Sequence, residues 1–196
     1  MGEEKTKDKI LKESLKLFAK NGFEAVSVES IAKAVGIKAP SLYKHFENKN
    51  EILEKIFERA NAADEEKAQE LDMPEENGVN SGSLSFGQIK EFSKEMLRHW
   101  TDDEFFCNFR RLLTVRQYKS EKDMELYNQY ISAGPVKYMA EIFLSQGIEE
   151  RKAKFYASEF YGIMHLFYSL YDSGEKIEDL LIMLDEHMES FERNFL

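Results

Sequence analysis

The sequence predicts an all-α fold. Only three prolines occur in 196 residues, runs of β-branched residues that alternate with period two are absent, and apolar residues recur at helical spacing. A hydrophobic content of 42%, with 15 Phe and 9 Tyr, is ample for a core. We expect helices over residues 5–21, 28–35, 39–46, 49–69, 88–100, 103–118, 121–132, 135–147, 150–172 and 176–195.

The first two helices are bounded by residues suited to helix ends. The first has an apolar face that includes Ile10 and Phe18, and Gly22 follows at the position where a left-handed residue ends a helix. Ser27 is a good N-cap for the second helix, and Gly36 ends it. The first and second helices are therefore separated by a short turn.

The third helix begins immediately after the second. Pro40 falls in its first turn, where a missing N–H group is tolerated, and Leu42 and Phe46 share the face that should be buried. Asn48 then caps a fourth helix, and Glu51 stands three residues later, as in a capping box. Two very short helices followed directly by another are typical of a helix-turn-helix.

Later parts of the chain carry clear breaks. Residues 72–87 are polar and rich in Gly, Ser and Asn, which predicts a loop. Gly134-Pro135 separates two helices of the middle region, and Asp172-Ser173-Gly174 separates the two long helices at the end. The chain has no internal repeat.

The charge is distributed unevenly. The net charge is −10, but residues 1–50 hold ten Lys and seven Asp or Glu, a balance of +3, whereas the remainder holds 17 Lys or Arg and 30 Asp or Glu, a balance of −13. A basic N-terminal region followed by an acidic remainder is consistent with phosphate binding by the N-terminal region. The single cysteine, Cys107, excludes a disulfide framework. Without a signal peptide or an apolar run near the ~20 residues that span a bilayer, we expect a cytoplasmic protein with no membrane partner.

Motifs for catalysis, metals and cofactors are absent. The four histidines show no HExxH or paired metal spacing, and no GxSxG, phosphate loop or GxGxxG occurs. The Asp185-Glu186-His187 cluster consists of adjacent helical residues, which point in different directions. We therefore expect that the protein is not an enzyme and that it binds no metal and no cofactor.

The outward face of the third helix suits DNA. Pro40, Tyr43 and Lys44 lie opposite the buried face, with Ser41 and His45 at the flanks. Hydroxyl and ammonium groups suit phosphates or guanine edges, and apolar carbon suits thymine methyl groups. Lys49 opens the fourth helix, where its ammonium could hold a phosphate.

This stretch resembles the DNA-binding domain of the TetR family of transcriptional regulators over about residues 6–55. The matching residues are Ile10-Leu11, Phe18, Gly22-Phe23, Val28, Ile31-Ala32, Val35-Gly36-Ile37, Pro40-Ser41-Leu42-Tyr43, His45-Phe46 and Asn48-Lys49. Lys38 departs from the family, in which Ser or Thr is frequent. The resemblance implies that the DNA-binding residues are Ser27, Val28, Lys38, Ala39, Pro40, Ser41, Tyr43, Lys44, His45 and Lys49.

The resemblance also implies the organisation of the chain. It implies a three-helix helix-turn-helix domain over residues 1–48 and a helical ligand-binding and dimerisation domain over residues 49–196, with the helix from 49 as connector. The last two helices would form a four-helix interface between two copies, through Phe160, Phe167, Leu170, Leu180, Leu184, Met188 and Phe191. Candidate residues for a mostly apolar small-molecule effector, chosen among the aromatic helices, are Trp100, Phe105, Phe109, Tyr127, Tyr161 and His165.

These inferences converge on one function. We expect a homodimeric, sequence-specific DNA-binding regulator, a repressor released from a palindromic double-stranded operator by a small-molecule ligand. Apolar stripes and aromatic clusters also occur in ordinary helical cores, so the alternative is a non-enzymatic helical interaction module without sequence-specific DNA binding. The outward residues of the third helix distinguish the two.

Overall fold

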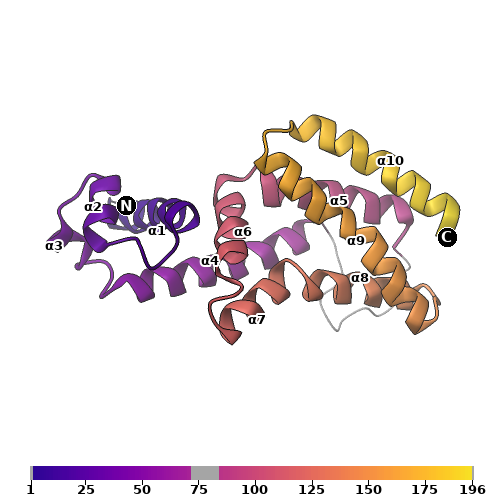
Figure 1. The fold of residues 1–196 in the computed structure, drawn as a ribbon, viewed down its shortest axis with the longest axis horizontal. Helices are drawn as coiled ribbons and strands as arrows, with labels where there is room; N and C mark the ends of the chain where they lie inside the picture. The colour runs from indigo at the N-terminus through magenta and orange to yellow at the C-terminus, as the bar shows by residue number, and fades with distance from the viewer. Residues whose placement is uncertain (1, 72–83, 196) are drawn as a thin grey trace. The chain divides into compact units, whose positions relative to one another are not determined.

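The computed structural model describes residues 2–71 and 84–195. In these ranges the regular secondary structure is entirely helical, and turns and loops connect the helices (Figure 1). The predicted all-α fold is confirmed. The helices run α1 Gly2–Asn21, α2 Val28–Val35, α3 Ala39–Leu42, α4 Lys49–Glu70, α5 Phe86–Thr101, α6 Glu104–Arg116, α7 Glu121–Tyr130, α8 Ala133–Ser145, α9 Glu150–Asp172 and α10 Ile177–Phe195.

Three expectations differ from the structure in detail. Gly134-Pro135, expected to separate two helices, lies in the first turn of α8, and the break falls at Ile131 and Ser132. Most of the predicted loop over residues 72–87 lies outside the described residues, but Phe86 and Gly87 already belong to α5. This helix begins early because Ser85 is its N-cap and forms a capping box with Gln88. The helix predicted over residues 39–46 ends at Leu42, after which the chain continues in tight turns.

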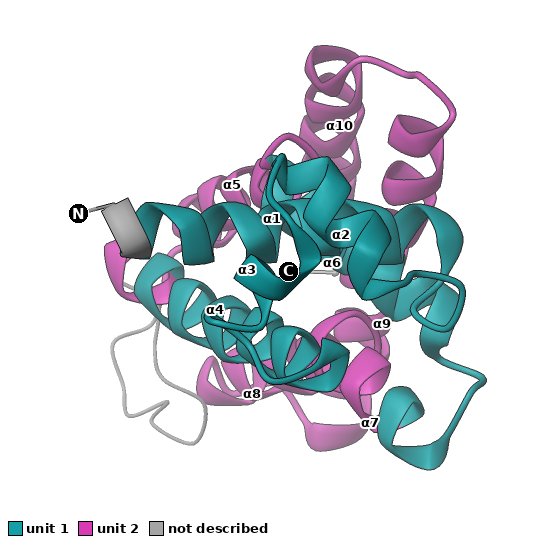
Figure 2. Cartoon of the chain, turned by 90° about the vertical axis from the view of Figure 1, so that its left-hand side faces the viewer, with its two compact units in different colours: residues 1–67, 104–124 teal, residues 68–103, 125–196 magenta. Residues whose placement is uncertain are grey.

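The chain divides into two compact units (Figure 2). Unit 1 comprises residues 1–67 and 104–124, and unit 2 comprises residues 68–103 and 125–196. Unit 1 thus contains α6 and most of α4 in addition to the first three helices. The functional division expected between residues 48 and 49 stays a prediction.

The core of unit 1 combines aliphatic and aromatic side chains of α1 to α4 with aromatic side chains of α6. Both α2 and α6 pack against α1, and α3 packs against α2. On α6, Phe109 is completely buried and meets Phe57 of α4 edge to face, with ring centroids 5.3 Å apart. The completely buried residues of the first four helices include Ile10, Phe18, Ile31, Leu42, Ile52 and Ile56.

The core of unit 2 is built around α9, which packs against α5, α8 and α10. Phe143 of α8, Phe160 of α9 and Phe191 of α10 form an aromatic cluster with ring centroids 5.4–5.9 Å apart. Pairs at this separation add to the stability that burial of the rings provides. Among the described residues, no helix has both the length and the apolar character that crossing a membrane requires.

Candidate nucleic-acid interface

Local hydrogen bonds fix both ends of α2. The hydroxyl of Ser27 accepts a hydrogen bond from the N–H of Ser30 at 3.1 Å, and the Ser30 hydroxyl accepts one from the N–H of Ser27, also at 3.1 Å. At the other end Gly36 adopts φ +82°, a left-handed conformation in which its N–H reaches the carbonyl of Ala32. The chain therefore turns from α2 to α3 within three residues.

Two buried side chains hold α3 and the turns that follow it. Leu42 is completely buried, and Phe46 is nearly so. The N–H groups of His45 and Phe46 both donate to the carbonyl of Leu42, at 2.9 and 3.1 Å, which closes the chain into a compact turn. Because Leu42 and Phe46 point inward, the residues between them are presented at the surface.

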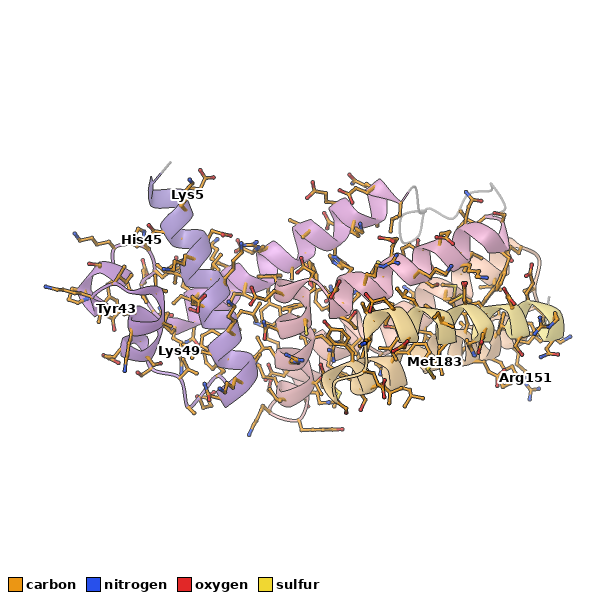
Figure 3. All side chains as sticks on the ribbon, turned by 90° about the horizontal axis from the view of Figure 1, so that it is seen from above. Lys5, Tyr43, His45, Lys49, Arg151 and Met183 are labelled. Carbon is orange, nitrogen blue, oxygen red and sulfur yellow. The ribbon has the colours of Figure 1, made fainter. Side chains whose placement is uncertain are left out.

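The expected DNA-binding residues all reach the surface. Tyr43 is 53% exposed, and Figure 3 labels it together with His45 in unit 1. The members of the expected set that are exposed are Ser27, Lys38, Pro40, Tyr43 and Lys44, and those that are half-buried are Val28, Ala39, Ser41, His45 and Lys49.

Two exposed lysines supply unpaired positive charge on this surface. Neither Lys38 nor Lys44 has an ion-pair or hydrogen-bond partner in the described part of the chain, and Lys38 stands at the N-cap of α3 without a side-chain cap bond. The imidazole of His45 has a buried Nδ1 with no hydrogen-bond partner among the described residues, so its contact with a ligand would use Nε2. Exposed ammonium groups of this kind can bind phosphate oxygens.

Lys49, which is expected to hold a phosphate, is bonded within the chain in this structure. Its ammonium group turns inward and donates to the carbonyl oxygens of Phe23, Val26 and Glu24, at 2.7, 2.9 and 3.4 Å. A second lysine acts similarly at the far end of α2, where Lys9 of α1 donates to the carbonyl of Val35 at 2.7 Å. No local pattern in the sequence indicates this role of Lys9, because the bond spans 26 residues.

The aromatic residues proposed for an effector do not gather in one unit. Phe105 and Phe109 belong to unit 1, whereas the other four belong to unit 2. Trp100 is buried beside Tyr130, with ring centroids 6.2 Å apart. That these six residues bind an effector therefore stays a prediction.

Within unit 2, one pair of these residues is in contact. The rings of Tyr161 and His165 on α9 contact edge to face, with centroids 5.7 Å apart. Burial lowers the pKa of His165 below its ordinary value of 6.5. His165 is half-buried, as are Tyr161 and Tyr127.

The residues expected at the dimer interface are mostly core residues. Phe160, Phe167, Leu180, Leu184, Met188 and Phe191 are 0–2% exposed within the single chain, and their contact with a second chain stays a prediction. Only Leu170 of the expected set is half-buried. The large apolar side chains that α9 and α10 leave exposed are Phe155, Leu166, Ile182 and Met183 (Figure 3 labels Met183).

Comparison with known proteins identifies the helix-turn-helix. Residues 10–56 match the family model of bacterial regulatory proteins of the tetR family. The helix-turn-helix segment of this chain is of the tetR type. The family is one of transcriptional regulators rather than enzymes.

One curated relative has a named regulatory role. The chain is 42% identical over 52 residues to IcaR of Staphylococcus epidermidis, described as a negative transcriptional regulator of the biofilm operon icaADBC. The match covers 26% of this chain and 28% of IcaR, so it spans little more than a quarter of the length of the curated relative.

Solved structures share the fold over nearly the whole chain. A TetR-like transcriptional regulator from Rhodococcus sp. RHA1 has a TM-score of 0.70 at 15% identity, and 96% of each chain is covered. SmeT in complex with triclosan has a TM-score of 0.63 at 18% identity, covering 94% of this chain and 90% of that one. At these identities the likeness shows the fold alone.

Proposed function

We propose that the chain is a sequence-specific DNA-binding transcriptional regulator that acts as a repressor. The observation that carries this proposal is the surface after α2, where Lys38, Tyr43 and Lys44 are exposed within the segment that matches the tetR family. The named role of IcaR as a negative regulator supports the sign of regulation.

In this proposal the exposed residues divide the work of recognition. Pro40, Ser41 and Lys44 lie nearest the bases, where hydrogen bonds and apolar contacts read sequence in the major groove. Tyr43, His45 and Lys38 bind phosphates, which fixes the register of the protein on the duplex. The buried Leu42 and Phe46 act only by holding these side chains outward.

A second copy of the chain covers the exposed apolar residues of α9 and α10. Leu166 is 49%, Ile182 60% and Met183 44% exposed, although large apolar side chains in water lose the stabilisation that burial gives. A two-fold dimer through this surface presents two helix-turn-helix segments. Such a dimer reads a palindrome with half-sites one helical turn, about 34–36 Å, or a multiple of it apart.

A largely apolar small molecule releases the repressor in this proposal. Support comes from the aromatic side chains of α5 to α9 and from the structure of SmeT with triclosan, whose fold this chain shares. Ligand binding would favour a conformation in which the two helix-turn-helix segments no longer match successive grooves.

Selection of bound duplexes from a random DNA library tests the proposal. We expect a palindrome to be enriched at moderate salt without added ligand. A double variant, Lys38→Ala with Lys44→Ala, should lose the enrichment, whereas Lys152→Ala with Lys154→Ala removes two exposed lysines from α9 and should keep it. Failure of the folded, dimeric protein to enrich any sequence would favour the alternative, a helical interaction module without sequence-specific DNA binding.

A further inference from the structure

Lys49 has all its hydrogen-bonding capacity engaged inside the chain. A lysine ammonium group has three donors and no acceptor. The ammonium of Lys49 lies 2.7, 2.9 and 3.4 Å from three carbonyl oxygens, those of Phe23, Val26 and Glu24. A phosphate could gain this ammonium only if one or more of these carbonyl bonds were given up.

The three carbonyls belong to the turn between α1 and α2. This turn covers residues 22–27, and its last residue, Ser27, is the N-cap of α2. Val26 is buried, and its carbonyl is one residue away from this cap. The Lys49 bonds therefore act on the backbone that sets where α2 begins.

The aromatic ring of the same turn is held by two cations. The ammonium of Lys49 lies 4.3 Å from the centroid of the Phe23 ring, and the guanidinium of Arg116 on α6 lies 4.9 Å from it. Phe18 of α1 meets the ring edge to face at 5.0 Å. Cations over an aromatic face are attracted by its electrons, most strongly where water is excluded, and Phe23 is only 8% exposed.

The guanidinium of Arg116 is itself fixed. Its Nε donates to the carboxylate of Asp123 at 2.7 Å, and the Ser120 hydroxyl donates to the other oxygen of that carboxylate at 2.7 Å. The ring of Phe23 thus connects the turn before α2 to α1, α4 and α6 within unit 1. Such a turn has little freedom to shift.

We propose that Lys49 is a positioning residue of the DNA-binding surface and not a phosphate ligand. Its ammonium holds the turn that precedes α2, and so keeps the helix-turn-helix in the arrangement that presents Lys38, Tyr43 and Lys44. This inference rests on the proposed DNA-binding function.

Salt dependence of DNA binding distinguishes a phosphate ligand from a positioning residue. Each phosphate contact contributes about 0.9 to the slope of log affinity against log salt on duplex DNA. Lys38→Ala should therefore reduce the magnitude of this slope by about 0.9 for each protomer bound. Lys49→Ala should weaken binding at every salt concentration but keep the wild-type slope.

A second variant separates charge from hydrogen bonding. Lys49→Gln removes the charge but retains an amide that can donate to the carbonyls of the turn. A positioning role predicts an affinity between those of the wild type and Lys49→Ala, with the wild-type slope. If either Lys49 variant reduced the magnitude of the slope as much as Lys38→Ala does, the proposal would be overturned.

Amide hydrogen exchange without DNA supplies a readout independent of DNA binding. In Lys49→Ala, exchange of the amides of residues 22–31 should become faster than in the wild type, while Lys44→Ala should leave it unchanged. Unchanged exchange in Lys49→Ala would overturn the proposal. Failure of the wild type to bind any duplex would instead refute the proposed function, and the exchange result would still decide how Lys49 acts.

Discussion

The carboxyl group of Asp64, on α4, should make the stability of the protein depend on pH. Its Oδ1 is buried and has no hydrogen-bond partner among the described residues. Burial, with a smaller contribution from the charge of Glu65, raises the pKa of Asp64 from 3.8 to about 6. The ionised form is thus disfavoured in the folded chain.

The sign of the effect follows from proton binding. Between pH 3.8 and about 6 the folded state holds the Asp64 proton and the unfolded state has released it, so stability falls as the pH rises through this range. Above pH 6 the free energy of unfolding is about 3 kcal/mol lower than it is below pH 3.8, because each unit of the pKa difference corresponds to about 1.36 kcal/mol. Asp64→Asn keeps the shape without the charge and should recover this stability.

Urea unfolding, followed by circular dichroism at about pH 4.5 and 7.5, measures the effect. From the two pKa values the advantage of Asp64→Asn should be about 2 kcal/mol larger at the higher pH. Glu66→Gln, which removes an exposed carboxylate from the same helix, is the matched control for the loss of one negative charge. If Asp64→Asn gained equally at both pH values, the argument from burial would be refuted.

Three further predictions concern the caps, the core and the surface. Ser27→Ala removes the N-cap of α2 and should lower the free energy of unfolding by about 1 kcal/mol, whereas Ser158→Ala, in the interior of α9, should change it little, as chemical denaturation can measure. Leu42→Ala, at a completely buried site, should lower the free energy of unfolding by about 2–5 kcal/mol in the same assay. Tyr43→Ala, at the exposed neighbouring position, should lower it by less than ~0.5 kcal/mol and should instead weaken DNA binding. Ile182→Asp should convert the proposed dimer to a folded monomer, as sedimentation equilibrium would show.

Opposite results would identify which step of the reasoning fails. Equal losses for the two serine variants would mean that the cap of α2 contributes nothing. A Tyr43 variant with wild-type affinity for DNA would remove that side chain from the interface. An Ile182→Asp protein that remains dimeric would place the subunit contact elsewhere on unit 2.

Helix ends were predictable because their chemistry is local. The cap bond at Ser27 reaches only to Ser30, and the side chain of Asn48 accepts from the N–H of Glu51 at 3.0 Å, again three residues away. A residue type at a fixed offset is enough to indicate such bonds. The end of α3 was predicted four residues too late because the bonds from His45 and Phe46 to Leu42 form a turn with the same inward spacing as a helix.

The partner that covers an apolar stripe could not be predicted. Leu180, Leu184 and Met188 have the spacing of one helix face whether that face meets the same chain or another. In the folded chain this face of α10 is buried within unit 2, and the apolar residues left exposed, Ile182 and Met183, lie outside the stripe. Periodicity indicates which residues share a face, but burial depends on contacts distant in sequence.

The positions of the lysines show why a motif does not fix a contact. Both ends of α2 are held by ammonium groups, from Lys9 and Lys49, that bond to carbonyls 23 to 26 residues away in sequence. The charge of each remains and adds to the field that attracts DNA. Release of counterions, however, requires an ammonium that reaches a phosphate, and these two are engaged elsewhere. The salt dependence of binding should therefore follow exposed lysines that reach phosphates, such as Lys38, and not the number of lysines in residues 1–50.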